Sequence, residues 1–124
     1  MPLVQGSTAP KFTLPHAVFT GLASPTRGST ETCVWRFSLN PGSEPVIHSL
    51  TREEIFVALS GAALATVDGV EHHVTAGDAL VVPAGVPFGM GNPHNEPFEA
   101  VAVFPVGGQA AMPNADPFTP PWAA

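Results

Sequence analysis

Residues 48–61 read HSLTREEIFVALSG and place one histidine and two glutamates ahead of an alternating apolar run that a glycine ends. Successive side chains of a β-strand point to opposite faces of its sheet. If the run from residue 54 forms a strand, Glu54, Phe56 and Ala58 share one face, while Ile55 and Val57 share the other. The stretch therefore predicts a strand that carries a carboxylate and an aromatic ring on one face.

Strand-like runs of roughly five to eight residues continue along the chain, and a turn signal closes each of them. The strongest signal is Asp68-Gly69, between ALATV and VEHHV, because a two-residue type I′ turn needs positive φ at both positions. Further strands are expected at CVWRFSL, DALVV, FGMGN and FEAVAVFPV, and nothing in the sequence favours a long helix. Roughly seven to nine short antiparallel strands in one domain predict an all-β barrel or jelly roll.

The composition agrees with a single all-β domain. A chain of 124 residues is long enough for one hydrophobic core and too short for two. Apolar residues make up 44% of it, while 12 glycines and 15 prolines are too many for a helical bundle. The single cysteine, Cys33, excludes an internal disulfide, and we interpret it as a core residue rather than a nucleophile.

Charge and hydropathy exclude two classes of partner. The formal net charge is -6 and the fixed cations are only Lys11, Arg27, Arg36 and Arg52, so no basic surface is available for nucleic acid. No apolar run approaches the roughly 18 residues that span a bilayer. The start, MPLVQGSTAP, lacks the features of a signal peptide. We therefore expect a soluble, cytoplasmic protein that binds neither nucleic acid nor a membrane.

Two motifs in the middle of the chain resemble the two sequence motifs of the cupin superfamily, which are small jelly-roll barrels. The first spans residues 42–61 and includes His48 and Glu54, and the second spans residues 77–92 and includes Phe88. Their order and separation also agree with that family. The resemblance implies a single-domain, cupin-like jelly roll.

The resemblance divides the chain into three parts. Residues 33–106 form the barrel core, residues 1–32 an N-terminal arm with edge strands, and residues 107–124 a Pro-rich C-terminal arm. The last part ends in MPNADPFTPPWAA, whose prolines cannot donate a continuous ladder of hydrogen bonds. We expect Phe118 and Trp122 to attach this arm to the chain itself or, more readily, to a second copy in a homodimer.

The metal positions of the family are only half retained. In a typical cupin, two histidines and a glutamate of the first motif and one histidine of the second bind a divalent metal. Here only His48 and Glu54 match, and Leu50 and Phe88 occupy the other two positions. Because metal sites normally use at least three protein ligands, we expect no metal cofactor. The alternative is Zn, Fe, Ni or Mn bound by His48, Glu54 and an unidentified third ligand.

The same alternation predicts an apolar ligand pocket around these two polar residues. His48 and Leu50 would face one side, and the residues after Phe88 at every second position would face it too. The register of the strand at 33–39 leaves open whether Trp35 and Phe37 or Arg36 point inward. The expected pocket residues are Trp35, Phe37, Leu50, Phe56, Phe88, Met90 and Asn92.

His48 and Glu54 are the candidate catalytic residues. A carboxyl buried among apolar groups has a raised pKa and a neighbouring imidazole opposes that shift, so the pair could share a proton near neutral pH. His48 would be the general base and Glu54 its orienting partner or the acid, in a metal-independent isomerase, cyclase or lyase. Metal-free cupins that act as sugar epimerases, and others that look like polyketide cyclases, make this reaction class compatible with the resemblance.

Three alternatives remain open at this point. The protein could be a metal-dependent, oxygenase-like cupin with a reduced ligand set, or a ligand sensor without turnover. It could also be a barrel packed solid with side chains, in which His48 and Glu54 only satisfy each other's hydrogen bonds.

Overall fold

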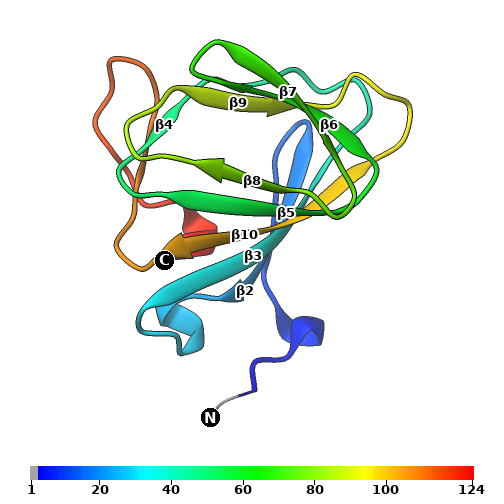
Figure 1. Cartoon of the computed structure of the whole chain (residues 1–124). Coiled ribbons are helices and arrows are strands. Elements are labelled where there is room, and N and C mark those ends of the chain that lie inside the picture. The colour runs from blue at the N-terminus through cyan, green and yellow to red at the C-terminus, as the bar shows by residue number, and fades with distance from the viewer. Residues whose placement is uncertain (1–2) are drawn as a thin grey trace.

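Two antiparallel β-sheets face each other in the computed structural model, which describes residues 3–124 (Figure 1). The larger sheet has the strand order β1-β2-β3-β10-β5-β8, and these strands are Lys11–Thr13, Ala17–Ala23, Thr32–Leu39, Phe98–Pro105, Glu54–Ser60 and Ala79–Val82. The smaller sheet has the order β7-β6-β9, with the strands Val70–Thr75, Ala62–Val67 and Phe88–Gly91. This is the all-β architecture that the sequence predicts.

Short elements complete the fold. A two-stranded ladder joins β11 (Ala110–Ala111) to β4 (Ser49–Leu50). The helical elements of the described residues are three single turns of 3-10 helix, which are η1 (Gly6–Thr8), η2 (Pro25–Arg27) and η3 (Pro121–Ala123). Within residues 3–124, the structure contains no helix of the length and apolarity that crossing a membrane requires.

The register of β3 settles which of its side chains point inward. Cys33, Trp35, Phe37 and Leu39 are buried in alternation, whereas Arg36 is exposed. Arg36 lies on the outer face, where its Nη2 is 3.7 Å from Glu99 Oε1. Of the two alternatives that the sequence left open for this strand, the inward position of Trp35 and Phe37 is the correct one.

Glycines fit where the turns require them. The hairpin between β6 and β7 turns at Asp68 and Gly69, with φ values of 51° and 79°, so both central residues have the positive φ of the predicted turn. Gly61 ends β5 with a φ of 75°, and a Cβ at this position would collide with the carbonyl oxygen of Pro97. The glycine that closes the opening stretch is therefore needed for its conformation and for space.

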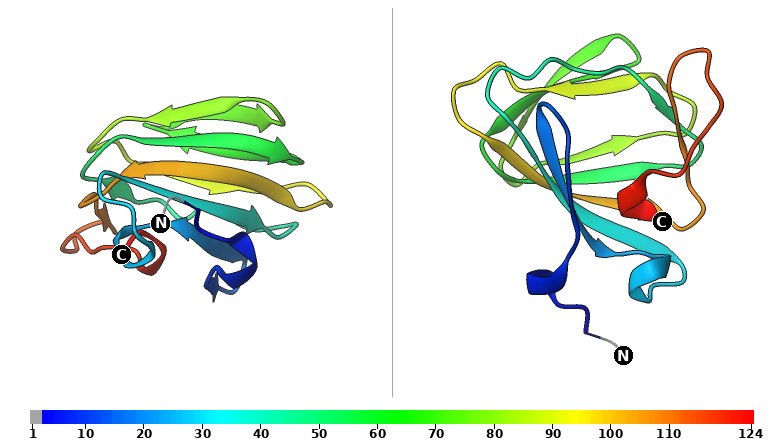
Figure 2. Two further views of the ribbon diagram at one scale, coloured as in Figure 1. Left: turned by 90° about the horizontal axis from the view of Figure 1, so that it is seen from below. Right: turned by 180° about the vertical axis from the view of Figure 1, so that it is seen from behind.

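The C-terminal segment packs on its own chain. Trp122 stacks on Phe19 of β2, with ring centroids 3.8 Å apart and planes within 6°. Cys33 donates a hydrogen bond from Sγ to the carbonyl of Ala123 at 3.5 Å, and burial raises the pKa of that thiol. Figure 2 shows this red turn beside the strands of the larger sheet. Trp122 is thus attached to its own barrel rather than to a second copy.

Phe118 differs from Trp122, because 45% of it is exposed. It pairs through its backbone with Ala110, and its amide donates to the Ala110 carbonyl at 2.8 Å. A role for Phe118 in a homodimer stays a prediction.

Candidate functional site

A cavity of about 300 Å³ lies between the two sheets, and its wall is almost wholly apolar. The larger sheet contributes side chains from β2, β3, β5 and β10, and the smaller sheet contributes side chains from β9. The barrel is therefore not packed solid. Of the nine residues that the sequence predicts for the site, the cavity brings together eight, which are Trp35, Phe37, His48, Leu50, Glu54, Phe56, Phe88 and Met90.

Glu54 is the first residue of β5, and its carboxyl faces the cavity. Its side chain points inward because the ladder pairs Glu54 with Val82 and leaves Glu54, Phe56 and Ala58 on the buried face. Only 4% of the residue is exposed, and within residues 3–124 the carboxyl has no hydrogen-bond or ion-pair partner. Burial raises the pKa of the Glu54 carboxyl to about 8, so the group is mostly protonated and uncharged at neutral pH.

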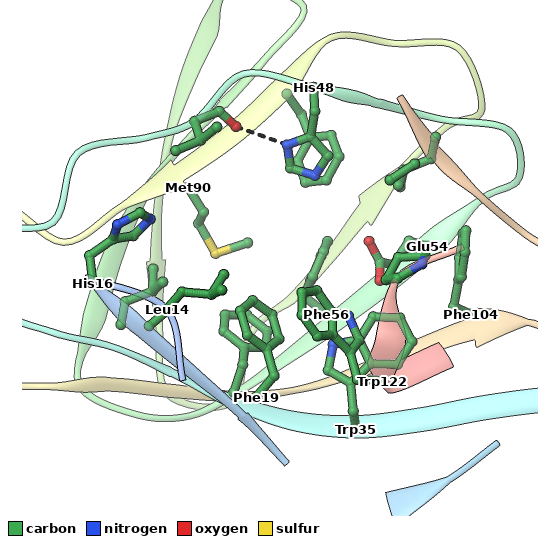
Figure 3. Close-up of a pocket in the computed structure, with 18 of the residues that line it drawn as sticks. Leu14, His16, Phe19, Trp35, His48, Glu54, Phe56, Met90, Phe104 and Trp122 are labelled. Atoms are coloured by element: carbon green, nitrogen blue, oxygen red, sulfur yellow. Dashed lines mark hydrogen bonds between the residues drawn. The ribbon is translucent and has the colours of Figure 1, made fainter. Parts of the chain in front are cut away.

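His48 lies opposite the second motif. Its backbone exchanges two hydrogen bonds with Phe88, at 2.9 and 2.8 Å, and the two rings are 4.4 Å apart between centroids. Its Nδ1 is 2.8 Å from the carbonyl oxygen of Val46 (Figure 3). Because a carbonyl can only accept, Nδ1 is assigned the hydrogen, and Nε2 keeps a free lone pair.

The protonation state of His48 follows from the same surroundings. Burial lowers the pKa of His48, and the hydrogen bond to Val46 opposes that shift. A lowered pKa keeps the imidazole neutral at neutral pH, in the form that accepts a proton. The same apolar surroundings therefore raise the pKa of Glu54 and lower that of His48. At neutral pH, Glu54 can donate a proton and His48 can accept one.

His48 and Glu54 do not form the direct pair that the sequence suggested. No hydrogen bond or ion pair joins these two described residues, and Figure 3 shows them at separate places on the wall. The physical reason is their origin in different parts of the fold. Glu54 projects from the larger sheet, whereas His48 is held against Phe88 of the smaller one. They neither satisfy each other nor share a proton directly.

The sequence predicts that Asn92 lines the pocket, and this prediction is wrong. Asn92 is completely buried, but it does not line the cavity. Its Nδ2 donates to the carbonyls of Leu39 at 3.2 Å and Glu96 at 2.8 Å, and its Oδ1 accepts from the amide of His94 at 3.1 Å. These hydrogen bonds use both Nδ2 donors and hold the loop after β9 in place, so the side chain has a structural role away from the cavity.

Sequence reasoning missed the part of the wall that the chain ends supply. The N-terminal segment contributes Leu14, His16, Ala17 and Phe19, and the C-terminal segment contributes Ala110, Met112, Phe118, Pro120 and Trp122. Aromatic residues in otherwise Pro- and Gly-rich segments were the available signal. Such residues predict an apolar contact, but they do not identify the surface that is contacted.

The side chains of the site do not fit a transition-metal centre. Leu50 and Phe88 line the cavity at the two positions where the resemblance places histidines, and neither has a donor atom. Across residues 3–124, no group of three or more His, Cys, Asp or Glu side chains could hold a metal ion. His48 and Glu54 alone supply one ligand fewer than catalytic metal sites normally use.

Known proteins share this architecture. A search of curated proteins finds no relative that matches the sequence. Among solved structures, the polyketide cyclase RemF from Streptomyces resistomycificus matches with a TM-score of 0.78 at 18% identity, over 94% of this chain and 87% of that one. An RmlC-like cupin from Shewanella frigidimarina matches with a TM-score of 0.73 at 20% identity, over 85% of this chain and 90% of that one.

A predicted oxalate decarboxylase from Thermotoga maritima also shares the fold, with a TM-score of 0.68 at 20% identity, over 89% of this chain and 98% of that one. Identities this low show the fold alone. The sequence profile of the cupin domain matches residues 35–104, which is more than half of the chain and includes His48, Glu54 and Phe88. The chain therefore belongs to the cupin family.

Proposed function

We propose that this cupin binds a small, largely apolar carbonyl compound in its cavity and moves protons on it without a metal. The observation that carries the proposal is the pairing of a cavity of about 300 Å³ with two polar groups of opposite protonation preference, Glu54 and His48. Isomerisation, cyclisation and elimination next to a carbonyl all begin with the removal of one proton and the delivery of another. One acid and one base are sufficient for that step.

Each group transfers one proton in the proposed step. His48 Nε2 takes a proton from the carbon next to the ligand's carbonyl, and the released electron pair forms a carbon–carbon double bond. The carbonyl oxygen takes the proton of the Glu54 carboxyl, so that an enol, an imidazolium and a carboxylate result. Return of both protons regenerates the protein, and the position to which the carbon proton returns decides between exchange and isomerisation.

The surrounding residues hold these two groups ready for the reaction. The hydrogen bond from Nδ1 to Val46 fixes the orientation and tautomer of the His48 ring. Phe56 and Phe88 line the cavity with their rings 5.8 Å apart, and apolar walls of this kind keep water away from a reactive enol. The Glu54 carboxyl therefore stays protonated and the His48 imidazole stays neutral until a ligand binds.

Structural neighbours support the reaction class without identifying it. The neighbour with the highest TM-score of the three is described as a polyketide cyclase, a name that fits proton removal beside carbonyl groups. Another is described as a predicted oxalate decarboxylase, which is a different reaction on the same fold. The choice between these reaction classes therefore rests on the local chemistry of His48 and Glu54, because a fold alone does not specify function.

Deuterium exchange at the carbon next to a carbonyl tests the proposal. Protein dialysed against a chelator is incubated in D₂O with a panel of aromatic methyl ketones, and exchange is followed by proton NMR. We expect one or more ketones to exchange, and we expect His48→Ala to slow that exchange by roughly 10²- to 10⁴-fold. His72→Ala is the matched control, because His72 lies exposed on β7 away from the cavity.

Three other outcomes would replace the proposal. Exchange that appears only after zinc or iron is added would establish a metal-dependent enzyme. Exchange that survives His48→Ala would remove His48 as the base. Tight binding of a ketone with no exchange in any of the panel would favour a ligand sensor.

A further inference from the structure

The cavity wall contains no fixed positive charge. The four fixed cations of the chain all lie within residues 3–124, and none of them lines the cavity. Arg27 is occupied by the backbone carbonyls of Leu22, Thr8 and Gln5, at 3.0, 3.1 and 2.8 Å. Arg36 lies on the outer face of the larger sheet beside Glu99. A ligand inside the barrel therefore meets no cation that could balance a negative charge.

The wall also offers an anion little compensation for its lost hydration. Two of its titratable side chains are the carboxyls of Glu44 and Glu54, and the others are the imidazoles of His16 and His48. The remaining surface consists of aliphatic groups and aromatic rings, whose faces are electrically negative. An anion that enters would lose its hydration and gain neither an ion pair nor a favourable ring face, so its entry is disfavoured.

A cation meets a less severe but similar obstacle. Of the two carboxyls in the wall, Glu44 is exposed to solvent, whereas Glu54 is buried and burial keeps it in its uncharged form. His48 is likewise neutral and offers only the lone pair of Nε2. Binding a cation would require Glu54 to ionise inside an apolar wall, whereas an uncharged ligand requires no change in either group.

The Glu54 carboxyl is the spare donor on its side of the cavity. The Trp35 ring also lines the cavity, but its Nε1 is enclosed and has no hydrogen-bond partner, so it is not presented to a ligand. Figure 3 shows Trp35 and Glu54 on the same side of the cavity, away from Leu14 and His16. A ligand oxygen that only accepts hydrogen bonds suits the Glu54 side, whereas the free lone pair of His48 Nε2 suits a ligand carbon that gives up its proton.

We propose that the cavity selects an uncharged compound of one or two rings that directs a carbonyl oxygen to Glu54 and the carbon next to that carbonyl to His48, and that it rejects carboxylates of the same shape. This inference rests on the proposed function, because it names the ligand of the same cavity. The volume of about 300 Å³ is at the lower end of the range for small-molecule sites, which limits the ligand to that size.

Three naphthalenes of nearly equal shape test the charge selection. They are 6-acetyl-2-naphthol, which is uncharged, 6-hydroxy-2-naphthoic acid, which is an anion at neutral pH, and 6-(1-aminoethyl)-2-naphthol, which is a cation. Each is titrated against the full chain, with the uncharged fluorescent dye N-phenyl-1-naphthylamine as the displaced reporter. We expect the ketone to bind roughly a hundredfold or more tightly than the carboxylate, and also more tightly than the amine.

Two positions make the result specific to the cavity. Ala110→Phe fills the cavity from β11 and should abolish binding of the dye and of all three naphthalenes. Glu54→Gln keeps a hydrogen-bond donor of the same size, so it should bind the ketone within a few-fold of the wild type. Glu54→Leu removes that donor and should weaken the ketone by roughly tenfold, which separates a hydrogen bond from simple packing.

The outcomes distinguish this inference from the function on which it rests. If the dye enters the wild type but the carboxylate or the amine binds as tightly as the ketone, charge selection is wrong and binding in the cavity stands. If the dye does not enter the wild type, or enters Ala110→Phe equally well, the cavity is not a binding site and both proposals fail.

Discussion

The central strands and the two chain ends line the same cavity, but they contribute different things to it. The middle of the chain supplies His48 and Glu54, the two cavity residues with shifted pKa values. The chain ends supply mainly apolar surface, above all the stacked rings of Phe19 and Trp122. In this barrel, the candidate catalytic groups come from the middle of the chain, and its two ends supply apolar parts of the cavity wall.

The two regions are also held in place by different forces. Strand register fixes Glu54 because a one-residue slip would turn the side chain to the outer face. Trp122 belongs to no strand, and it is held by ring stacking and by backbone contacts of the last residues, such as Thr26 Oγ1 to the Ala124 carbonyl at 2.8 Å. Hydrogen-bonded strand ladders thus position the residues in the middle of the chain, whereas ring stacking and a few terminal hydrogen bonds position the C-terminal end.

Removal of the Trp122 ring should reduce stability more than any other substitution proposed in this Discussion. Trp122→Ala should lower the free energy of unfolding by about 4 kcal/mol, because a stacked indole is lost and a void is left against Phe19. It should also weaken binding of an uncharged dye by opening the wall. Urea denaturation followed by circular dichroism gives the first quantity, and a fluorescence titration gives the second.

Phe118→Ala is the matched control for that experiment. Its ring also lines the cavity, but 45% of the residue is exposed, so we expect a loss of less than about 1 kcal/mol. If both substitutions cost the same, stacking on Phe19 is not what holds the C-terminal segment, and the division between centre and ends is wrong.

The same division separates what the sequence could predict from what it could not. The alternation in residues 54–60, the Asp68-Gly69 turn and the two cupin motifs are local signals, and each fixed an element or a face correctly. The placing of Trp122 depends on a contact with a strand about a hundred residues earlier in the chain, which no local pattern encodes. The pocket prediction failed at Asn92 because period-two alternation alone placed it inward, whereas its amide binds the nearby Glu96 carbonyl and the carbonyl of Leu39 on a strand distant in sequence.

The acid of the site can be tested through stability. In the unfolded chain Glu54 loses its proton near the ordinary glutamate pKa of 4.5, but in the folded protein it keeps the proton up to about pH 8. The folded state is therefore favoured fully below pH 4.5 and loses stability as the pH rises towards 8, by roughly 1.4 kcal/mol for each pH unit. Glu54→Gln removes this loss, because the amide does not ionise in either state.

We expect Glu54→Gln to be about 3 kcal/mol more stable relative to the wild type at pH 8 than at pH 5. Denaturant titrations of both proteins at the two pH values give the quantity. Glu53→Gln serves as the control, since Glu53 is exposed and does not line the cavity. An equal pH dependence in wild type and Glu54→Gln would mean that Glu54 is ionised in the fold, and the proposed acid would be lost.

Trp35 lies where the two regions meet, and its replacement by phenylalanine should alter stability least. Its ring lies 6.5 Å from Trp122 and 6.0 Å from Phe104 between centroids, so it packs against both the C-terminal segment and the core. Its enclosed Nε1 has no partner, and an unmet donor costs about 1–3 kcal/mol. Trp35→Phe removes that cost but also loses buried ring surface, so the two effects nearly cancel.

Trp35→Phe should therefore change the free energy of unfolding by less than about 1 kcal/mol, as measured by urea denaturation. Binding of an aromatic ketone should stay within a few-fold of the wild type, because the enclosed Nε1 does not reach the ligand. A loss of stability well above about 2 kcal/mol would mean that the buried ring surface outweighs the unmet donor. A much weaker ketone would instead mean that Nε1 donates to the ligand, and specificity for the carbonyl would not depend on Glu54 alone.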